Sequence, residues 1–299
     1  MTDALVQGIL LGGYYALIAA GLSFMFSVMR IINLAHGSLA VVAAFALFVL
    51  ADRFGISPFL GLLIVLPLMA LLGWALQRVM LDRATRAGAL VPILTTFGLS
   101  IVVDNLLFTQ FGANTRSLAP YIGDLSFDSW QLTDEISVGK LAVLTFVVAV
   151  VLLAAIQAFL SFTQLGRAIR ATSEDSDTAG LVGIDARRVN AVATAIAMVS
   201  VGLAGAALGT RATFDAYAGG PQLLFAFEAA VIGGAGSVWG TLFGGILLAL
   251  GQSFGAQIAP QGFLIGGHVV FFAVLFARLF IPGSTFRTRV VAAFRRKPA

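Results

Sequence analysis

Long, uninterrupted apolar runs are the feature that most constrains how this chain can fold. Runs long enough to span a bilayer occur at about 4–29, 59–77, 90–110, 140–162, 190–210 and 262–281, and shorter or glycine-interrupted runs occur at about 37–51, 222–236 and 240–258. About 20 helical residues cross the hydrocarbon core of a membrane. The pattern therefore predicts an all-α polytopic membrane protein with about nine transmembrane helices, within a range of about eight to ten, some of them broken or re-entrant.

The composition agrees with this class and excludes others. Of the 299 residues, 59% are hydrophobic and only 11% are charged, whereas soluble domains carry roughly 25% charged residues. Continuous runs also argue against a β-barrel, which needs short alternating strands. The chain has no cysteine, and its two histidines, His36 and His268, are far apart. We therefore expect no disulfide, no metal site and no cofactor bound by this chain.

Basic residues set the expected orientation. If segment 163–189 lies inside and the spans alternate, fourteen of the 18 lysines and arginines fall on the inner side. Cytoplasmic loops are enriched in such residues, so we expect the N-terminus outside and the C-terminus in the cytoplasm. The net charge of +4 then follows from topology and predicts no nucleic-acid partner. The expected outer set is Arg53, Arg116, Lys140 and Arg211, and the inner set is Arg30, Arg78, Arg83, Arg86, Arg167, Arg170, Arg187, Arg188, Arg278, Arg287, Arg289, Arg295, Arg296 and Lys297.

Residues 1–299 are expected to form a single transmembrane domain, with a cytoplasmic loop at 163–189 and a large external segment at 111–139. The last residues read as a basic anchor on the membrane surface. The external segment is predicted to receive an external partner, with Trp130 as an anchor at the membrane interface. Its acidic residues are Asp124, Asp128, Asp134 and Glu135.

The stretch "RIINLAHGSLA" interrupts the first two apolar runs. It places Asn33, His36, Gly37 and Ser38 where one longer run would otherwise continue. One interpretation is a turn at the inner face, with Ser38 as the N-cap of the second helix. The other is a broken helix whose polar groups face a translocation pathway.

Glycines mark a second interruption in "AVIGGAGSVWGTLFGG". Gly233, Gly234 and Gly236 lie close together at the end of an apolar run, and such a cluster breaks helix regularity. It predicts either part of a pore lining or gate, or a tight turn between two spans. Glycine pairs with G-x-x-x-G spacing predict close helix packing elsewhere; they are Gly8/Gly12, Gly205/Gly209 and Gly240/Gly244.

Two carboxylates, Asp104 and Glu228, fall within apolar runs. An aspartate at membrane depth costs about 2.5 kcal/mol or more, so such side chains usually face the bundle interior. We expect Asp104 near the outer interface, where water would screen its charge. Glu228 is predicted either to line a substrate pathway or to form a structural ion pair, with Arg211 as one partner to consider.

The stretch "RAIRATSEDSDTAGLVGID" is a charged island in the second half of the chain. We expect a helix of about ten residues in it, with Thr172 or Ser173 as N-cap, Glu174 and Asp175 in the first turn, and Gly183 at the end. Ala179, Leu181 and Val182 give that helix a small apolar patch. It is therefore either a solvated cytoplasmic loop or a surface helix that docks into another protein.

Four blocks of the sequence resemble the permease family of branched-chain amino acid ABC importers. They are "GLSFMFSVMRIINLAHGSLAVVAAF", "PILTTFGLSIVVDNLLFTQFG", "GRAIRATSEDSDTAGLVGID" and "AAVIGGAGSVWGTLFGGILLAL". The resemblance implies a multi-pass permease subunit of the bacterial inner membrane. It implies as partners two cytoplasmic ATPases that bind ATP, a second permease subunit (related or identical), and a periplasmic substrate-binding protein, in addition to membrane lipid.

The resemblance also implies roles for particular residues. The charged island becomes the ATPase-coupling segment, with Glu174, Asp175, Ala179 and Gly183 on positions that match the family's motif, and Leu181 of the island's apolar patch is a further candidate. The interruptions and the carboxylate described above, rather than the resemblance, supply the candidate residues of the translocation pathway: Asn33, His36, Glu228, Gly233, Gly234 and Gly236. Phe225 stands where members of that family often carry a lysine, so the solute stays open between branched-chain amino acids, urea, short amides and similar carboxylates.

Sequence motifs separate the competing classes. Gly139-Lys140 lacks the upstream glycine and the following Ser/Thr of a phosphate-binding loop, so this chain is not expected to be the ATPase or any other enzyme. The two histidines are not spaced for an intramembrane active site. The alternative to the importer is a proton-coupled secondary transporter that uses Glu228 or Asp104 as its proton relay.

Overall fold

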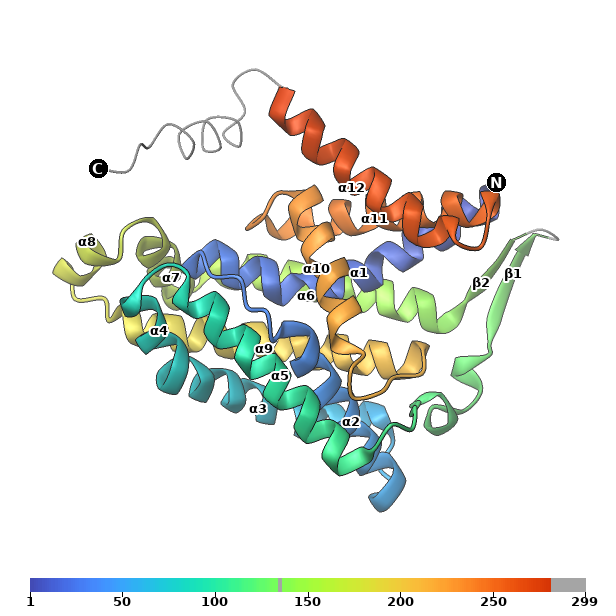
Figure 1. Ribbon diagram of the computed structural model, residues 1–299, viewed down its shortest axis with the longest axis horizontal. Helices are drawn as coiled ribbons and strands as arrows, with labels where there is room; N and C mark the ends of the chain where they lie inside the picture. Colours follow the sequence, from blue (N-terminus) through green and yellow to red (C-terminus); the bar gives the residue numbers. More distant parts are fainter. Residues whose placement is uncertain (134–135, 281–299) are drawn as a thin grey trace.

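The computed structural model describes residues 1–133 and 136–280, and almost all of its regular structure is helical (Figure 1). The longer helices are α1 (Thr2–Met29), α2 (His36–Phe54), α3 (Pro58–Leu76), α5 (Val91–Phe111), α6 (Lys140–Phe162), α9 (Ala186–Arg211), α10 (Gly219–Gly233), α11 (Val238–Ile258) and α12 (Gly262–Phe280). The shorter elements are a π-helical turn η1 (Gln77–Leu81), α4 (Asp82–Ala87), 3-10 turns η2 (Ala119–Tyr121) and η3 (Gly123–Ser126), strands β1 (Ser129–Thr133) and β2 (Ile136–Gly139), α7 (Gln164–Glu174) and α8 (Ser176–Leu181).

The all-α polytopic class is confirmed, but the count of nine spans is not. Among the described residues, seven helices are long and apolar enough to cross a membrane: α1, α2, the continuous helix 58–87, α5, α6, α9 and α11. At about 1.5 Å per residue, α10 is about 22 Å long and shorter than a bilayer core of about 30 Å. The apolar part of α12, Gly262–Arg278, is also shorter than the other spans. The expected basic tail, 281–299, lies outside the described residues, as do Asp134 and Glu135.

Helix α1 occupies the centre of the bundle because small residues line several of its faces. A Cβ atom placed at Gly12, Gly13 or Gly21 would collide with α11, α6 or α9, respectively. Its residues from Tyr14 to Met25 are all buried. By contrast, α5 and α6 expose much of their apolar surface, as expected for helices that face lipid or another subunit.

The G-x-x-x-G pairs do pack closely, as their spacing predicts. Gly205 of α9 lies against the backbone of Ala40 in α2. Gly240 and Gly244 of α11 lie against the backbone of α10, where Gly233 faces them. Without a hydrophobic drive between helices in lipid, such close backbone contact is a main source of association.

The β-hairpin and the short helices lie at two opposite ends of the bundle, whereas the connection between α1 and α2 lies within it (Figure 1). The β1–β2 hairpin lies at the end that holds the N-terminus, where Gln7 Nε2 donates a 2.8 Å hydrogen bond to the carbonyl of Ser137. The turn η2, which precedes the hairpin, contacts the end of α2, where the Tyr121 hydroxyl donates a 2.9 Å hydrogen bond to Asp52. This bond is the main cause that raises the pKa of Tyr121. Helices α4, α7 and α8 lie at the other end, which fits the alternation predicted from the basic residues.

The central packing can be tested with two matched glycine substitutions. Gly12→Ala puts a methyl group into the backbone of α11, whereas Gly98→Ala on α5 meets no atom within 4 Å. We expect Gly12→Ala to destabilise the protein by about 1–3 kcal/mol, as overpacked cores do. Gly98→Ala is expected to be neutral or stabilising by up to about 1 kcal/mol, through helix propensity. Thermal unfolding of both variants in one detergent is the measurement, and equal midpoints would contradict the packing argument.

Candidate functional site

Helix α2 begins in the middle of the membrane domain rather than at its inner surface. After α1 ends, Arg30 adopts a left-handed conformation (φ 57°) and residues 31–35 turn back along the helix. The buried His36 lies with Nε2 2.6 Å from the carbonyl oxygen of Ile18 and donates to it. Helix α1 is about 42 Å long, and Ile18 is about 24 Å from its start. This contact therefore places the start of α2 near mid-depth.

The structure shows a break in the helix at this stretch, and Ser38 is not the cap that the inner-turn interpretation expects. That its polar groups face a translocation pathway stays a prediction. Residue Ala35 is at the N-cap, and Ser38 lies inside α2. Side chains satisfy backbone groups that the break leaves free: Asn33 Oδ1 accepts from Ala35 N at 3.0 Å, and Thr96 Oγ1 of α5 accepts from Leu34 N at 3.0 Å. Irregular backbone at membrane depth survives only with such partners.

Helix α10 begins at the same level. A Cβ atom at Gly37 would collide with the backbone of Gly219, and one at Gly219 would collide with α2. The Tyr14 hydroxyl donates a 2.8 Å hydrogen bond to Gln222 Oε1 in the first turn of α10. Tyr14 is about 18 Å from the start of α1, so the N-termini of α2 and α10 meet near mid-depth. We call this meeting point the central break, formed by Asn33, His36, Gly37, Ser38, Asp104 and Gly219.

Asp104 belongs to the central break and not to the outer interface where the sequence placed it. Its side chain lies close enough to that of Ser38, in the first turn of α2, for the two to interact electrostatically. Its Oδ1 atom is buried and has no hydrogen-bond partner among the described residues. The partial positive charge of a helix N-terminus favours a carboxylate there, which explains why this charge is tolerated in an apolar helix.

Glu228 makes a short hydrogen bond to a histidine that the sequence gives no reason to connect with it. Its Oε1 lies 2.6 Å from His268 Nδ1, and this contact links α10 to α12. The Glu228 side chain is 2% exposed and that of His268 is 36% exposed. Arg211, the partner considered from sequence, instead lies over the ring of Tyr14 at 5.0 Å from its centre. The two members of the pair are 40 residues apart, and no spacing rule connects them.

The glycine cluster forms a tight turn between α10 and α11. Gly233 ends α10, and Gly234 and Gly236 both have φ of 92°, a conformation that favours glycine. The amide of Gly236 donates to Ser23 Oγ at 3.2 Å. This turn is separated from the central break by the length of α10, about 22 Å. A role for its glycines in gating stays a prediction.

The charged island is two helices rather than one. Thr172 and Ser173, the expected caps, lie within α7, which continues to Glu174. The cap of the second helix is Asp175, whose Oδ1 accepts from the amides of Asp177 and Thr178 at 3.0 and 3.1 Å. The Thr178 hydroxyl donates to Oδ2 at 2.6 Å, and these hydrogen bonds lower the pKa of the Asp175 carboxyl. Helix α8 therefore has six residues and not the expected ten.

The end of α8 presents apolar side chains to the outside. Leu181 is 87% exposed and Val182 is 75% exposed, whereas Ala179 is buried against the neighbouring helices. Gly183 follows with φ of 84° and ends the helix, as its position in the sequence predicts. We call Leu181 and Val182 the α8 tip.

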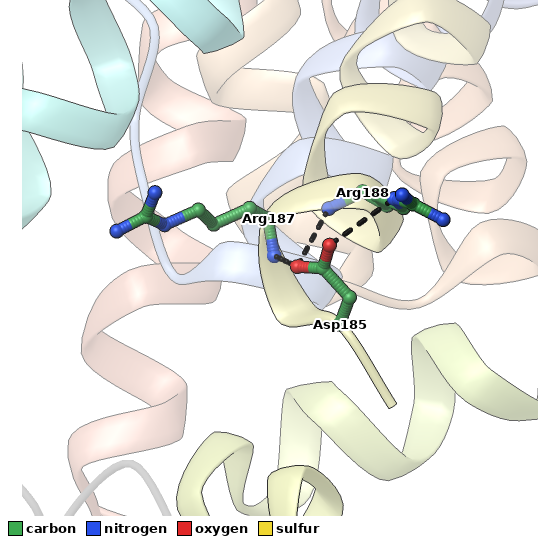
Figure 2. A network of polar contacts seen from close by, with 3 residues as sticks. All are labelled: Asp185, Arg187 and Arg188. Atoms are coloured by element: carbon green, nitrogen blue, oxygen red, sulfur yellow. Dashed lines mark hydrogen bonds and ion pairs between the residues drawn. The ribbon is translucent and has the colours of Figure 1, made fainter. Parts of the chain in front are cut away.

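Asp185 fixes the start of α9 directly after this tip (Figure 2). Its Oδ1 accepts from the amides of Arg187 and Arg188 at 3.0 and 3.3 Å, and its Oδ2 pairs with Arg188 Nε at 3.3 Å. Figure 2 shows that the two guanidinium groups point in opposite directions. The α8 tip is thus the end of a capped helix, and it is followed in sequence by the exposed basic side chains of Arg187 and Arg188.

Comparisons with known proteins identify the fold's family. The family described as branched-chain amino acid transport system, permease component, matches residues 4–279. The chain is 28% identical to the high-affinity branched-chain amino acid transport system permease protein BraD of Pseudomonas aeruginosa, over 85% of this chain and 86% of that protein. It is 26% identical to LivH of Escherichia coli, over 92% of this chain and 91% of that protein. It is also similar to PsaBC from Streptococcus pneumoniae in complex with Fab, with a TM-score of 0.49 and 13% identity, over 97% of this chain and 94% of that one.

These matches decide between the two classes of transporter predicted from sequence. Both relatives are named as permease proteins of transport systems, and the similarity covers most of each chain. The expectation of an ABC-importer permease subunit is confirmed, and the proton-coupled secondary transporter is not supported. The chain belongs to the family of permease components of branched-chain amino acid transport systems.

Proposed function

We propose that this chain is the multi-pass permease subunit of an ABC importer in the bacterial inner membrane, with its C-terminus in the cytoplasm. Its solute is a branched-chain amino acid or a related small polar molecule. The observation that supports this most is the family match over residues 4–279. The chain has no phosphate-binding loop, so ATP is bound and hydrolysed on partner subunits. This chain supplies the path through the membrane and no catalysis.

The central break is the candidate translocation site. It brings the positive ends of α2 and α10 to mid-depth, where such ends attract the carboxylate of a solute. Asn33 and His36 hold the irregular backbone in place, and Asp104 adds a negative group that suits an ammonium. Because Gly37 and Gly219 are in backbone contact, α10 would have to move away from α2 for a solute to pass between them.

The α8 tip is the candidate ATPase contact. Exposed leucine and valine side chains at the end of a short, capped helix suit an apolar groove on a soluble subunit. Asp175 and Gly183 fix the two ends of that helix, and Glu174 precedes it. At the opposite end of the bundle, segment 111–139 is the proposed landing area of a periplasmic binding protein, with Asp124 and Asp128 on its surface. A second permease subunit completes the assembly.

The energy source of uptake tests this function. Proteoliposomes that contain the chain with its ATPases, with the binding protein outside, should take up radiolabelled leucine only when ATP is enclosed. A protonophore should leave that uptake unchanged, because no step uses the proton gradient. Parallel assays with urea and acetamide identify the solute class. Uptake that persists without ATP and stops with the protonophore would contradict the proposal.

The ATPase contact is tested at the α8 tip. Leu181→Asp should weaken ATPase co-purification about tenfold or more. The substitution removes an apolar side chain whose burial in the complex would contribute about 1.5–3 kcal/mol. Gly183→Pro should do the same, because proline cannot adopt the φ of 84° found there. Leu181→Met keeps the apolar contact and serves as the control. Wild-type co-purification and ATPase stimulation in both Leu181→Asp and Gly183→Pro would show that the ATPase docks elsewhere.

A further inference from the structure

A cavity of about 370 Å³ lies at the end of the bundle that holds the N-terminus, between α1, α9, α11 and α12. Small-molecule sites in proteins begin at about 300 Å³, so its size suits one small solute. It is separate from the central break, since none of the residues that form the break line it. We call it the outer cavity.

Two opposite charges line the outer cavity. They are Asp3 at the start of α1 and Arg211 at the end of α9, and they are the only charged lining residues within the part of the chain that the structure describes. Within residues 1–133 and 136–280, neither takes part in an ion pair shorter than 4 Å. A carboxylate and a guanidinium thus line one cavity without forming an ion pair with each other.

Neighbouring side chains hold both charges in position. Arg211 lies over the ring of Tyr14, an arrangement that orients the guanidinium and leaves its N–H groups free to bind. Asp3 Oδ1 accepts a long hydrogen bond of 3.4 Å from Gln7 Nε2, which is itself held by the carbonyl of Ser137. Ser253 and Gln257 add further polar groups to the walls.

The remaining walls are apolar. Leu11 and Phe263 line the cavity beside the polar groups. A solute with one ammonium, one carboxylate and an apolar side chain would match each part of this lining. Urea and short amides carry no full charge and would leave both Asp3 and Arg211 without a partner.

A chain of contacts connects the outer cavity with the central break. The ring of Tyr14 lies under Arg211, and its hydroxyl bonds to Gln222 in the first turn of α10. Next to it, Tyr15 is bonded to Gln252 of α11 and packs its ring against Phe225, with centres 5.1 Å apart. A solute bound by Arg211 would thus be one side chain away from Tyr14, which Arg211 stacks on and which bonds to the start of α10.

We propose that the outer cavity binds a zwitterionic amino acid, with Asp3 receiving its ammonium and Arg211 its carboxylate, before the solute reaches the central break. The site selects amino acids over uncharged solutes. This inference rests on the proposed transport function for the class of solute, and it assigns the selection to this chain in addition to any binding protein.

Direct binding to the purified full-length chain in nanodiscs tests the site without partner subunits. The probe is radiolabelled leucine, with leucinamide and N-acetyl-leucine as competitors. Leucinamide lacks the carboxylate and N-acetyl-leucine lacks the ammonium, so each should compete at least about tenfold more weakly than leucine, the cost of one charge-assisted hydrogen bond. This comparison uses the unaltered protein and does not depend on the folding of a variant.

Two variants assign the groups. Arg211→Gln should weaken leucine binding about tenfold, and in this variant leucinamide should compete as well as leucine does. In Asp3→Asn, N-acetyl-leucine should compete as well as leucine does. Arg116→Gln is the matched control, because Arg116 also stacks on a ring, that of Phe48 at 5.3 Å, and does not line the cavity. Equal affinity for leucine in Arg211→Gln and in wild type would overturn the proposal.

A phosphatidylethanolamine headgroup also carries an ammonium and an anion. Binding is therefore measured in nanodiscs of phosphatidylglycerol alone and with phosphatidylethanolamine added. Leucine binding in the first kind supports an amino acid site. Absent leucine binding, with one phosphatidylethanolamine retained per chain in native mass spectra and lost in Arg211→Gln, would assign the cavity to lipid and overturn the proposal.

The outcome is separable from that of the transport function. Uptake of leucine that is driven by ATP, combined with no leucine binding to the isolated chain, would reject the outer site and leave the importer in place. Leucine binding without uptake in the complete system would reject the importer and leave the outer site standing.

Discussion

The structure depends on how backbone groups are satisfied where α2 and α10 begin in the middle of the membrane domain. An unpaired amide or carbonyl in hydrocarbon costs several kcal/mol, so a broken helix needs partners supplied by the protein itself. The side chains of Asn33 and Thr96 accept hydrogen bonds from backbone amides just before α2, and His36 donates a hydrogen bond to a backbone carbonyl of α1. The glycines of α2 and α10 then let the two helix ends touch.

This arrangement gives a physical route from fold to transport. The positive ends of α2 and α10 lie near the level of Ile18. The outer cavity, which contains Asp3 and Arg211, lies closer to the N-terminal end of α1. Tyr14 contacts both, through its ring to Arg211 and through its hydroxyl to Gln222. At the other end of the bundle, the α8 tip exposes apolar side chains. The proposed outer cavity and the proposed ATPase contact are thus at opposite ends of one packed unit.

Features that depend on local sequence were predictable. Long apolar runs predict the helices, G-x-x-x-G spacing predicts where backbones touch, and Gly183 predicts the end of α8. The interruption at 33–38 marks a break because polar residues are costly at membrane depth. The cap at Asp175 was missed because Thr172 and Ser173 are equally good caps by residue type, and the continuing helix α7 takes them up.

Features that depend on contacts between distant segments were not predictable. The depth at which α10 begins is set by Tyr14 and Gly37, which are about 200 residues away from it in sequence. The pair of Glu228 with His268 depends on the register between α10 and α12, and the position of Asp104 depends on where α2 starts. Asp3 and Arg211 share a cavity although they come from different helices.

The most direct test of this account is the position of the start of α10 along α1. A photoreactive diazirine residue of similar size is placed at Gln222, and the cross-linked peptide is identified by mass spectrometry. We predict attachment to α1 at Tyr14 or within one helical turn of it, because Gln222 bonds to that residue. The same residue placed at Ile258, at the exposed end of α11, should not attach there. Cross-links from position 222 only to the first turn of α1 would mean that α10 starts at the outer surface and that no central break exists.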